Sequence, residues 1–326
     1  MYEQYRLKEL RSAYSCQGWV LLIYYGILNM AVSAVMVVNA FAHSLAMVLS
    51  GKDVDPDLLF QSMMEESGWG YFLAIFIGLL LLLIWKKPKY MIKTIWKPGK
   101  PMKSGSFFAL LSIFISVQLG AQLLYMLMEW GANSFGYSMA EAMESAAGSA
   151  DTWSMFLYVG LGAPISEELL FRGVILRSME PYGKKFAIFG SAVLFGLYHA
   201  NLVQIPFAFV VGLVLGYVTV EYNVGWAIVL HMFNNLILSD TLTRLMEPLG
   251  LPWSELWFWV LIIGCAIAAV TILILKRREV KAWLGQYQND PQCTRAFWTA
   301  PGILTLTIVM VLMTLVSTLL MLSPIA

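Results

Sequence analysis

The chain has 326 residues, of which 59% are apolar and only 13% are charged. Soluble domains are about 45–50% apolar and about 25% charged, so this composition excludes an ordinary soluble protein. The net charge is +1 and no region is strongly basic, so no nucleic-acid partner is expected. Three scattered cysteines give neither a metal-ligand spacing nor a disulfide framework.

Long apolar stretches predict an all-α, polytopic helical membrane protein. A transmembrane helix needs about 20 apolar residues, and the continuous runs here differ from the alternating pattern of a membrane barrel. We predict about nine spans, or eight if one of the short fifth to seventh segments fails to cross the bilayer. The first is long enough to tilt or to continue past the membrane. The predicted spans are 17–48, 69–85, 105–129, 153–179, 187–204, 206–221, 224–239, 256–275 and 303–323.

The loops between these spans differ in basic residues. One side carries seven lysines from Lys86 to Lys103, together with the basic residues near the N-terminus, at 184–185 and after residue 275. The other side carries only Lys52 and Arg244, among eight acidic residues. Because cytoplasmic loops are enriched in Lys and Arg, we expect a multi-pass protein integral to the cell membrane. The N-terminus is expected in the cytoplasm and the C-terminus outside.

Ionisable residues are costly inside a membrane and usually have a function there. The fourth to seventh predicted spans hold Glu167, Glu168, Arg172, His199 and His231, whereas the remaining spans hold almost none. We therefore predict three parts: N-terminal helices and loops at 1–152, a catalytic membrane core of four helices at 153–241, and C-terminal helices at 242–326.

Two acidic residues and two basic residues, Arg172 and Arg177, occupy the fourth predicted span. Glu168 and Arg172 are four residues apart and share a helix face, so they can form an ion pair. Glu167 lies about 100° around an α-helix from Glu168. Glu167 is thus either a free carboxylate facing another helix or a second partner of Arg172. The Glu168–Arg172 pair can equally be structural, because breaking a buried pair is destabilising.

The fifth and seventh predicted spans repeat the four-residue spacing. Phe195 precedes His199, and His231 precedes Asn235, so each pair shares a face of an α-helix. A carboxylate, two imidazoles and a carboxamide can then converge, which suits activation of water and stabilisation of an oxyanion. The histidines can instead form interhelical hydrogen bonds, and Asn234 can replace Asn235 as the residue facing inward. Phe195 is expected to serve in packing.

These residues resemble a known family. Glu167-Glu168-Leu-Leu-Phe-Arg172, Phe195-Gly-Leu-Tyr-His199 and His231-Met-Phe-Asn-Asn235 follow the order EExxxR, FxxxH and HxxxN. That order is typical of the CAAX prenyl protease-like and bacteriocin-processing membrane proteins, the CPBP or Abi family. The resemblance covers roughly residues 153–240, a little over a quarter of the chain.

The resemblance implies an intramembrane glutamic endopeptidase that cleaves a peptide precursor or membrane protein without a covalent intermediate. By this analogy Glu167 and His199 activate water, and His231 and Asn235 stabilise the oxyanion. Glu168, Arg172 and Phe195 shape the site. No cofactor is expected; the alternative is zinc held by Glu167, His199 and His231. Asn235 favours the metal-free version, because a carboxamide is a poor zinc ligand and a good oxyanion donor.

Two other functions remain open at this stage. The same cavity can belong to a non-proteolytic immunity or scaffold protein that binds a peptide or partner. Intramembrane Glu and His also suit a proton-coupled transporter, although no pair of broken helices recurs in corresponding halves. The sequence does not give the oligomeric state, the substrate or the role of the outer spans.

Overall fold

The computed structural model describes residues 2–51, 53, 56, 67–147, 152–238, 254–286 and 290–325. These residues are almost entirely helical, which confirms the predicted all-α fold. A short antiparallel pair of strands joins β1 (Tyr137–Ser138), which follows the end of α4, to β2 (Ser323–Pro324), near the C-terminus.

Among the described residues, six helices are long and apolar enough to cross a membrane. The chain is therefore a multi-pass membrane protein, but the predicted count of nine spans is not confirmed. Helical segments do occupy the predicted spans at 153–179, 187–204 and 224–239, where they are shorter or divided. The six long helices are α1 (Tyr2–Leu49), α3 (Gly68–Tyr90), α4 (Ser104–Asn133), α10 (Gln204–Glu221), α13 (Ser254–Leu275) and α16 (Pro301–Leu320).

Helix α1 is much longer than one crossing requires. Its 48 residues extend about 72 Å at about 1.5 Å per residue, whereas the hydrocarbon core of a bilayer is about 30 Å thick. Helix α1 is therefore more than twice as long as this core is thick, which confirms that the first span is long for one crossing. Helix α3 bends near its end, where Lys87 has a φ of 62° directly before Pro88. The residue before a proline is disfavoured in the α region.

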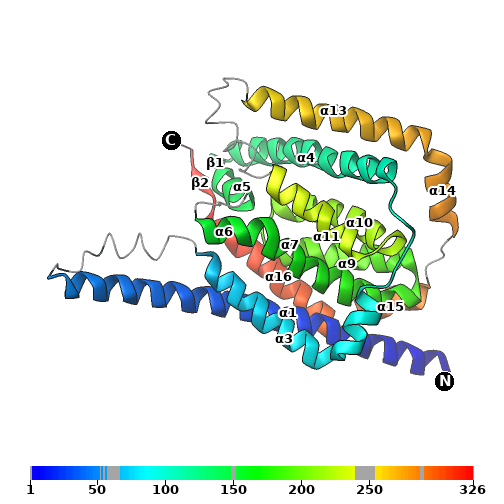
Figure 1. Ribbon diagram of the computed structural model, residues 1–326, viewed down its shortest axis with the longest axis horizontal. Helices are drawn as coiled ribbons and strands as arrows, with labels where there is room; N and C mark the ends of the chain where they lie inside the picture. The colour runs from blue at the N-terminus through cyan, green and yellow to red at the C-terminus, as the bar shows by residue number, and fades with distance from the viewer. Residues whose placement is uncertain are drawn as a thin grey trace.

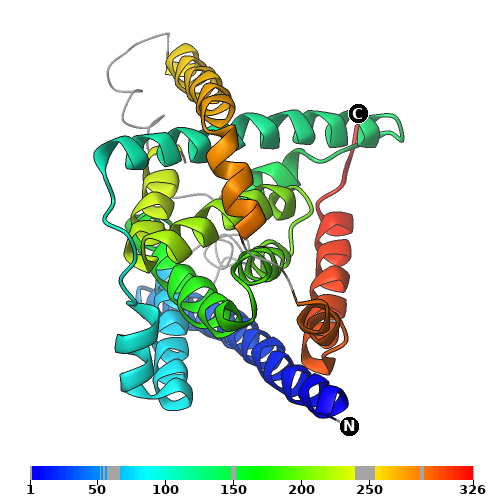
Figure 2. The ribbon, with the colours of Figure 1, turned by 90° about the vertical axis from the view of Figure 1, so that its right-hand side faces the viewer.

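The long helices enclose the segments that carry the three motifs. Helix α13 packs against α4 on one side, and α1 packs against α3 and α16 on another (Figure 1). The motif-bearing helices lie between these groups, and the view turned by 90° about the vertical axis keeps the same arrangement (Figure 2). The two chain termini lie at opposite ends of the helices (Figure 1).

The fourth predicted span is a helix that changes its winding several times. π-helical turns, with hydrogen bonds from residue i to i+5, alternate with α-helical ones and often mark functional sites. The change from α to π occurs between Glu167 and Glu168. The successive segments are α6 (Trp153–Leu157), η2 (Tyr158–Gly162), α7 (Ala163–Glu167), η3 (Glu168–Leu176) and α8 (Arg177–Met179).

The break between the fifth and sixth predicted spans lies earlier than expected. Helix α9 (Lys184–Tyr198) ends just before His199, and Ala200 has a positive φ of 49° in the turn that follows. The predicted bounds of 187–204 and 206–221 place the break at residue 205, which is wrong, because residue 205 and Pro206 lie in the first turn of α10. Proline is tolerated there, since the first turn has no intrahelical partner for its missing N–H.

The remaining elements complete the chain. The seventh predicted span begins as an α-helix and continues as a π-helical turn. The Gly/Ala/Ser-rich stretch before the motif region contains a short helix. These elements are η1 (Met91–Ile95), α5 (Ala140–Ala147), η4 (Glu180–Tyr182), α11 (Val224–Phe233), η5 (Asn234–Leu238), α14 (Arg277–Gln286) and α15 (Pro291–Trp298).

Glycines let α1 cross its neighbours at short distances. A methyl group at Gly302 would overlap the backbone oxygen of Ser15, and one at Gly18 would overlap the backbone of Gly302. Small residues allow this kind of close approach between membrane helices. The Gly302 N–H also donates to Ser15 Oγ at 2.8 Å. The crossing fixes α1 against α16 although the two are far apart in sequence.

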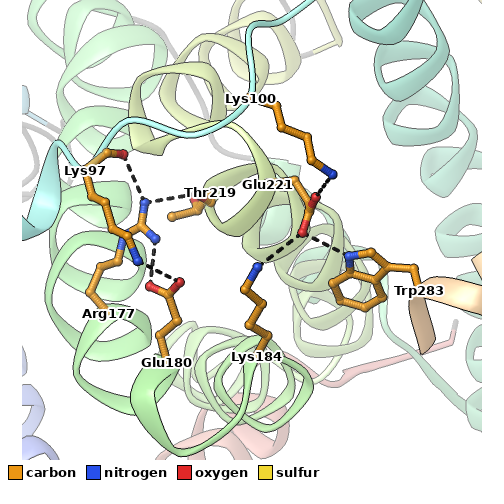
Figure 3. Close-up of polar contacts among 8 residues, drawn as sticks. All are labelled: Lys97, Lys100, Arg177, Glu180, Lys184, Thr219, Glu221 and Trp283. Carbon is orange, nitrogen blue, oxygen red and sulfur yellow. Dashed lines mark hydrogen bonds and ion pairs between the residues drawn. The ribbon is translucent and has the colours of Figure 1, made fainter. Parts of the chain in front are cut away.

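A polar cluster ties several helix ends together at the end of the bundle where α14 packs (Figure 3). Its centre is the buried Glu221 carboxylate, which pairs with Lys100 at 2.5 Å and Lys184 at 3.5 Å and accepts a hydrogen bond from Trp283 at 2.9 Å. Beside it, Arg177 pairs with Glu180 at 2.8 Å. We name this group the end cluster; it comprises Lys97, Lys100, Arg177, Glu180, Lys184, Thr219, Glu221 and Trp283.

Replacing Glu221 with Gln is expected to loosen this end of the bundle. Glu221→Gln removes the charge that two lysines share, and hydrogen bonds to charged groups contribute about 1.5–3 kcal/mol each. We expect a loss of about 1–3 kcal/mol in unfolding free energy and faster hydrogen exchange in α14. Glu279→Gln is the matched control, because Glu279 is 70% exposed and its ion pair, among the residues that the structure describes, is with the exposed Lys276. Unchanged exchange in α14 would contradict a tying role for Glu221.

Candidate active site

The predicted ion pair of the fourth span is present and has a third member. Arg172 Nη1 lies 3.1 Å from Glu168 Oε1, and both side chains are fully buried. The same carboxylate oxygen lies 3.0 Å from His231 Nδ1, on α11. A carboxylate can only accept here, so His231 Nδ1 carries the proton that it shares with Glu168. The link from Glu168 to His231 was not predicted, because spacing along one helix says nothing about contacts with another.

Glu167 lies in a different environment from Glu168. Its side chain is 23% exposed, and its Oε2 is 3.9 Å from His231 Nε2. That separation is longer than a direct hydrogen bond, and polar groups at such distances are often bridged by water. Of the two adjacent carboxylates, Glu167 is therefore the one that can reach water. Its nearest described basic partner is His231 rather than Arg172.

The Phe195 ring contacts both imidazoles of the site. It contacts the His199 ring edge-on at 4.8 Å between centroids and the His231 ring at 6.0 Å. The guanidinium carbon of Arg172 lies 4.1 Å from the centre of the Phe195 ring. This cation–π contact adds to the packing role predicted for Phe195. The second and third motifs thus meet around the first.

His199 lies just beyond the last residue of α9 and is partly exposed. Its Nδ1 is 2.8 Å from the backbone oxygen of Phe195. A carbonyl oxygen only accepts hydrogen bonds, so Nδ1 carries the proton and Nε2 is the acceptor in the neutral ring. The ring nitrogen that faces away from the helix is thereby prepared to accept a proton from water.

Asn235 lies one helical turn beyond His231, where α11 changes into the π-helical η5. Its Nδ2 donates to the backbone oxygen of Val159 at 2.9 Å, and its Oδ1 accepts from Asn234 at 3.0 Å. Asn234 in turn accepts from Gln118 at 3.2 Å. The α-helical spacing assumed for His231 and Asn235 does not continue through this junction. The two asparagines form an amide chain beside the glutamates and histidines.

Two tyrosines near the site were missed by the sequence analysis. Tyr24 of α1 lies near Ser166 and Glu167 of the fourth predicted span. Tyr198, beside His199, packs edge-on against Phe171 with ring centroids 5.3 Å apart, and its ring also contacts Tyr24. Tyr198 stands at an unassigned position inside the second motif, on α9, whereas Tyr24 is brought to the site by the packing of α1 against the motif helices.

The zinc alternative finds no support in the donor set. Among the residues that the structure describes, no group of three or more His, Cys, Asp or Glu side chains is arranged to hold a metal ion. His231 Nδ1 is shared with Glu168, so this histidine could bind a metal only through Nε2. We therefore derive no step through a metal.

The motif region matches a protein family. Residues 149–237 match the model described as Type II CAAX prenyl endopeptidase Rce1-like. The match covers all three motifs and confirms the resemblance that they predict. It supports CAAX-type endopeptidase activity within a membrane, on a peptide or protein substrate. No curated protein and no solved structure matches the chain.

Proposed function

We propose that the protein is a glutamic intramembrane endopeptidase, in which Glu167 activates the water that cleaves a peptide bond. The observation that carries this proposal is the contrast between two adjacent carboxylates. Glu168 is fully buried and paired with Arg172, whereas Glu167 is 23% exposed and has an imidazole nitrogen 3.9 Å away. A general base needs access to water and a neighbouring group that orients it.

In the proposed reaction, Glu167 and His199 share the activation of water. Glu167 accepts a proton as the water oxygen attacks the carbonyl carbon of the substrate, and the Nε2 acceptor of His199 orients the same water. The proton then passes to the amine nitrogen as the peptide bond breaks. One carboxylate thus acts first as base and then as acid.

The tetrahedral oxyanion needs hydrogen-bond donors, and we assign this role to His231 and Asn235. His231 already donates from Nδ1 to Glu168, so it can donate from Nε2 only as an imidazolium. Asn235 donates to Val159 in the resting structure and would have to turn its amide toward the substrate. Removing one such donor typically lowers kcat by about 10²–10³-fold.

The family description makes prenylated CAAX peptides the first substrates to test. Other membrane-bound peptide precursors are the second class. The principal alternative remains a non-proteolytic protein that binds a peptide or partner in the same cavity.

The test is cleavage of a peptide library, prenylated and unprenylated, by the purified full-length protein in detergent. We expect products that persist with a metal chelator and are lost in Glu167→Gln. Asn235→Ala is expected to lower kcat by about 10²-fold with little change in KM.

Two results would contradict the proposal. Loss of products under chelation, restored by zinc, would make Glu167, His199 and His231 metal ligands. Binding of a peptide without cleavage, unaffected by Glu167→Gln, would support the scaffold alternative.

A further inference from the structure

A cavity of about 650 Å³ opens on the outer surface of α1, away from the candidate active site. Its walls come from α1, the end of α3 and the junction between α15 and α16. We name it the α1 groove; the lining residues used below are Arg11, Trp19, Ile23, Trp85 and Thr299.

One end of the α1 groove is cationic. Arg11 Nε donates to Thr299 Oγ1 at 2.8 Å, which holds the guanidinium at this end. Lys86 adjoins the groove: its Nζ lies 3.7 Å from the centre of the ring of Trp85, which is a lining residue. The ion pairs found in the described part of the chain include neither Arg11 nor Lys86.

The other end of the α1 groove is apolar and faces the lipid. Trp19 is 45% exposed and Ile23 is 56% exposed, both within a predicted membrane span. Arg11 and Ile23 are twelve residues apart, or about 18 Å along the helix at about 1.5 Å per residue. That length is close to half of the roughly 30 Å hydrocarbon core, which is the depth of one leaflet. Tryptophan rings are typical of the membrane–water interface.

The walls of the α1 groove are fixed by close packing. The glycine crossing at Gly18 and Gly302 holds α1 against α16, and the Ser15–Gly302 hydrogen bond lies at the same crossing. The cations therefore keep a fixed position relative to the apolar wall. A ligand with a charged end and an apolar end requires such an arrangement.

We propose that the α1 groove binds one anionic phospholipid. Its phosphate contacts Arg11 and Lys86, and an acyl chain lies along Trp19, Ile23 and Trp85. The two cations complement the negative charge of the phosphate, and the distance from Arg11 to Ile23 is close to the depth of one leaflet. A peptide is a poorer occupant, because its backbone groups would lie unsatisfied against the hydrocarbon. This site is independent of the proposed proteolysis.

The test is native mass spectrometry of the full-length protein from mixed micelles that contain phosphatidylglycerol and phosphatidylcholine. The wild type is expected to retain one phosphatidylglycerol. Arg11→Gln with Lys86→Gln is expected to weaken that retention by at least about tenfold, since each basic residue near a membrane surface contributes to anionic-lipid binding. Arg277→Gln with Arg278→Gln removes two exposed cations from α14 and is expected to leave it unchanged.

A second variant tests the apolar end separately. Ile23→Trp fills the α1 groove and is expected to displace the lipid while both cations remain; the thermal unfolding midpoint of each variant checks that it is folded. Equal retention of both lipids by the wild type would overturn the proposal. So would unchanged retention in the Arg11/Lys86 variant, or an equal loss in the α14 control. Displacement of the lipid by a farnesylated peptide would instead identify an isoprenoid site.

Discussion

Glu167→Gln is expected to lower kcat for peptide cleavage by about 10²–10⁴-fold, the usual contribution of a general base. The amide has nearly the same shape as the carboxylate but cannot accept the proton from water. Glu167 is partly exposed and its nearest described basic atom is 3.9 Å away, so the exchange breaks no close ion pair. We therefore expect KM and the unfolding midpoint to change little.

The measurement is steady-state cleavage of the best library substrate, with thermal unfolding recorded on the same preparation. Glu279→Gln makes the same chemical exchange at an exposed position on α14 and is expected to retain full activity. A Glu167→Gln protein that is folded and keeps more than about a tenth of wild-type kcat would remove Glu167 from the proposed mechanism.

Glu168→Gln is expected to have the largest effect on stability. It leaves the Arg172 guanidinium buried without its carboxylate partner, and arginine cannot lose its charge. Breaking a buried pair by removing one partner costs about 3–5 kcal/mol. The Gln side-chain oxygen can still accept from His231 Nδ1, so the variant isolates the loss of charge from the loss of that hydrogen bond.

Unfolding titrations with SDS in mixed micelles measure this effect. The double variant Glu168→Gln/Arg172→Met is the informative comparison, because it removes both charges and keeps the volume. It is expected to be more stable than Glu168→Gln alone, since replacing a buried pair with apolar groups is often neutral. If the double variant were as unstable as the sum of the two single variants, the Glu168–Arg172 pair would carry no coupling energy.

Local spacing predicted some contacts of the site and missed others. Glu168 and Arg172 form the ion pair that their four-residue spacing indicates, because both lie on one continuous helix. The same spacing argument does not hold for His231 and Asn235. The helix changes from α to π between them, and no residue pattern in a single sequence marks that change.

The sequence by itself determined the class of protein, the region where ionisable residues are concentrated and the three motifs. The apolar content and the clustering of ionisable residues can be read directly from the amino-acid sequence, without a structure. Only the tertiary structure decided that Glu168 is shared by Arg172 and His231, that Phe195 contacts both histidines and that α1 brings Tyr24 to the site. These contacts depend on where helices cross, and crossings are set by packing between segments far apart in the chain.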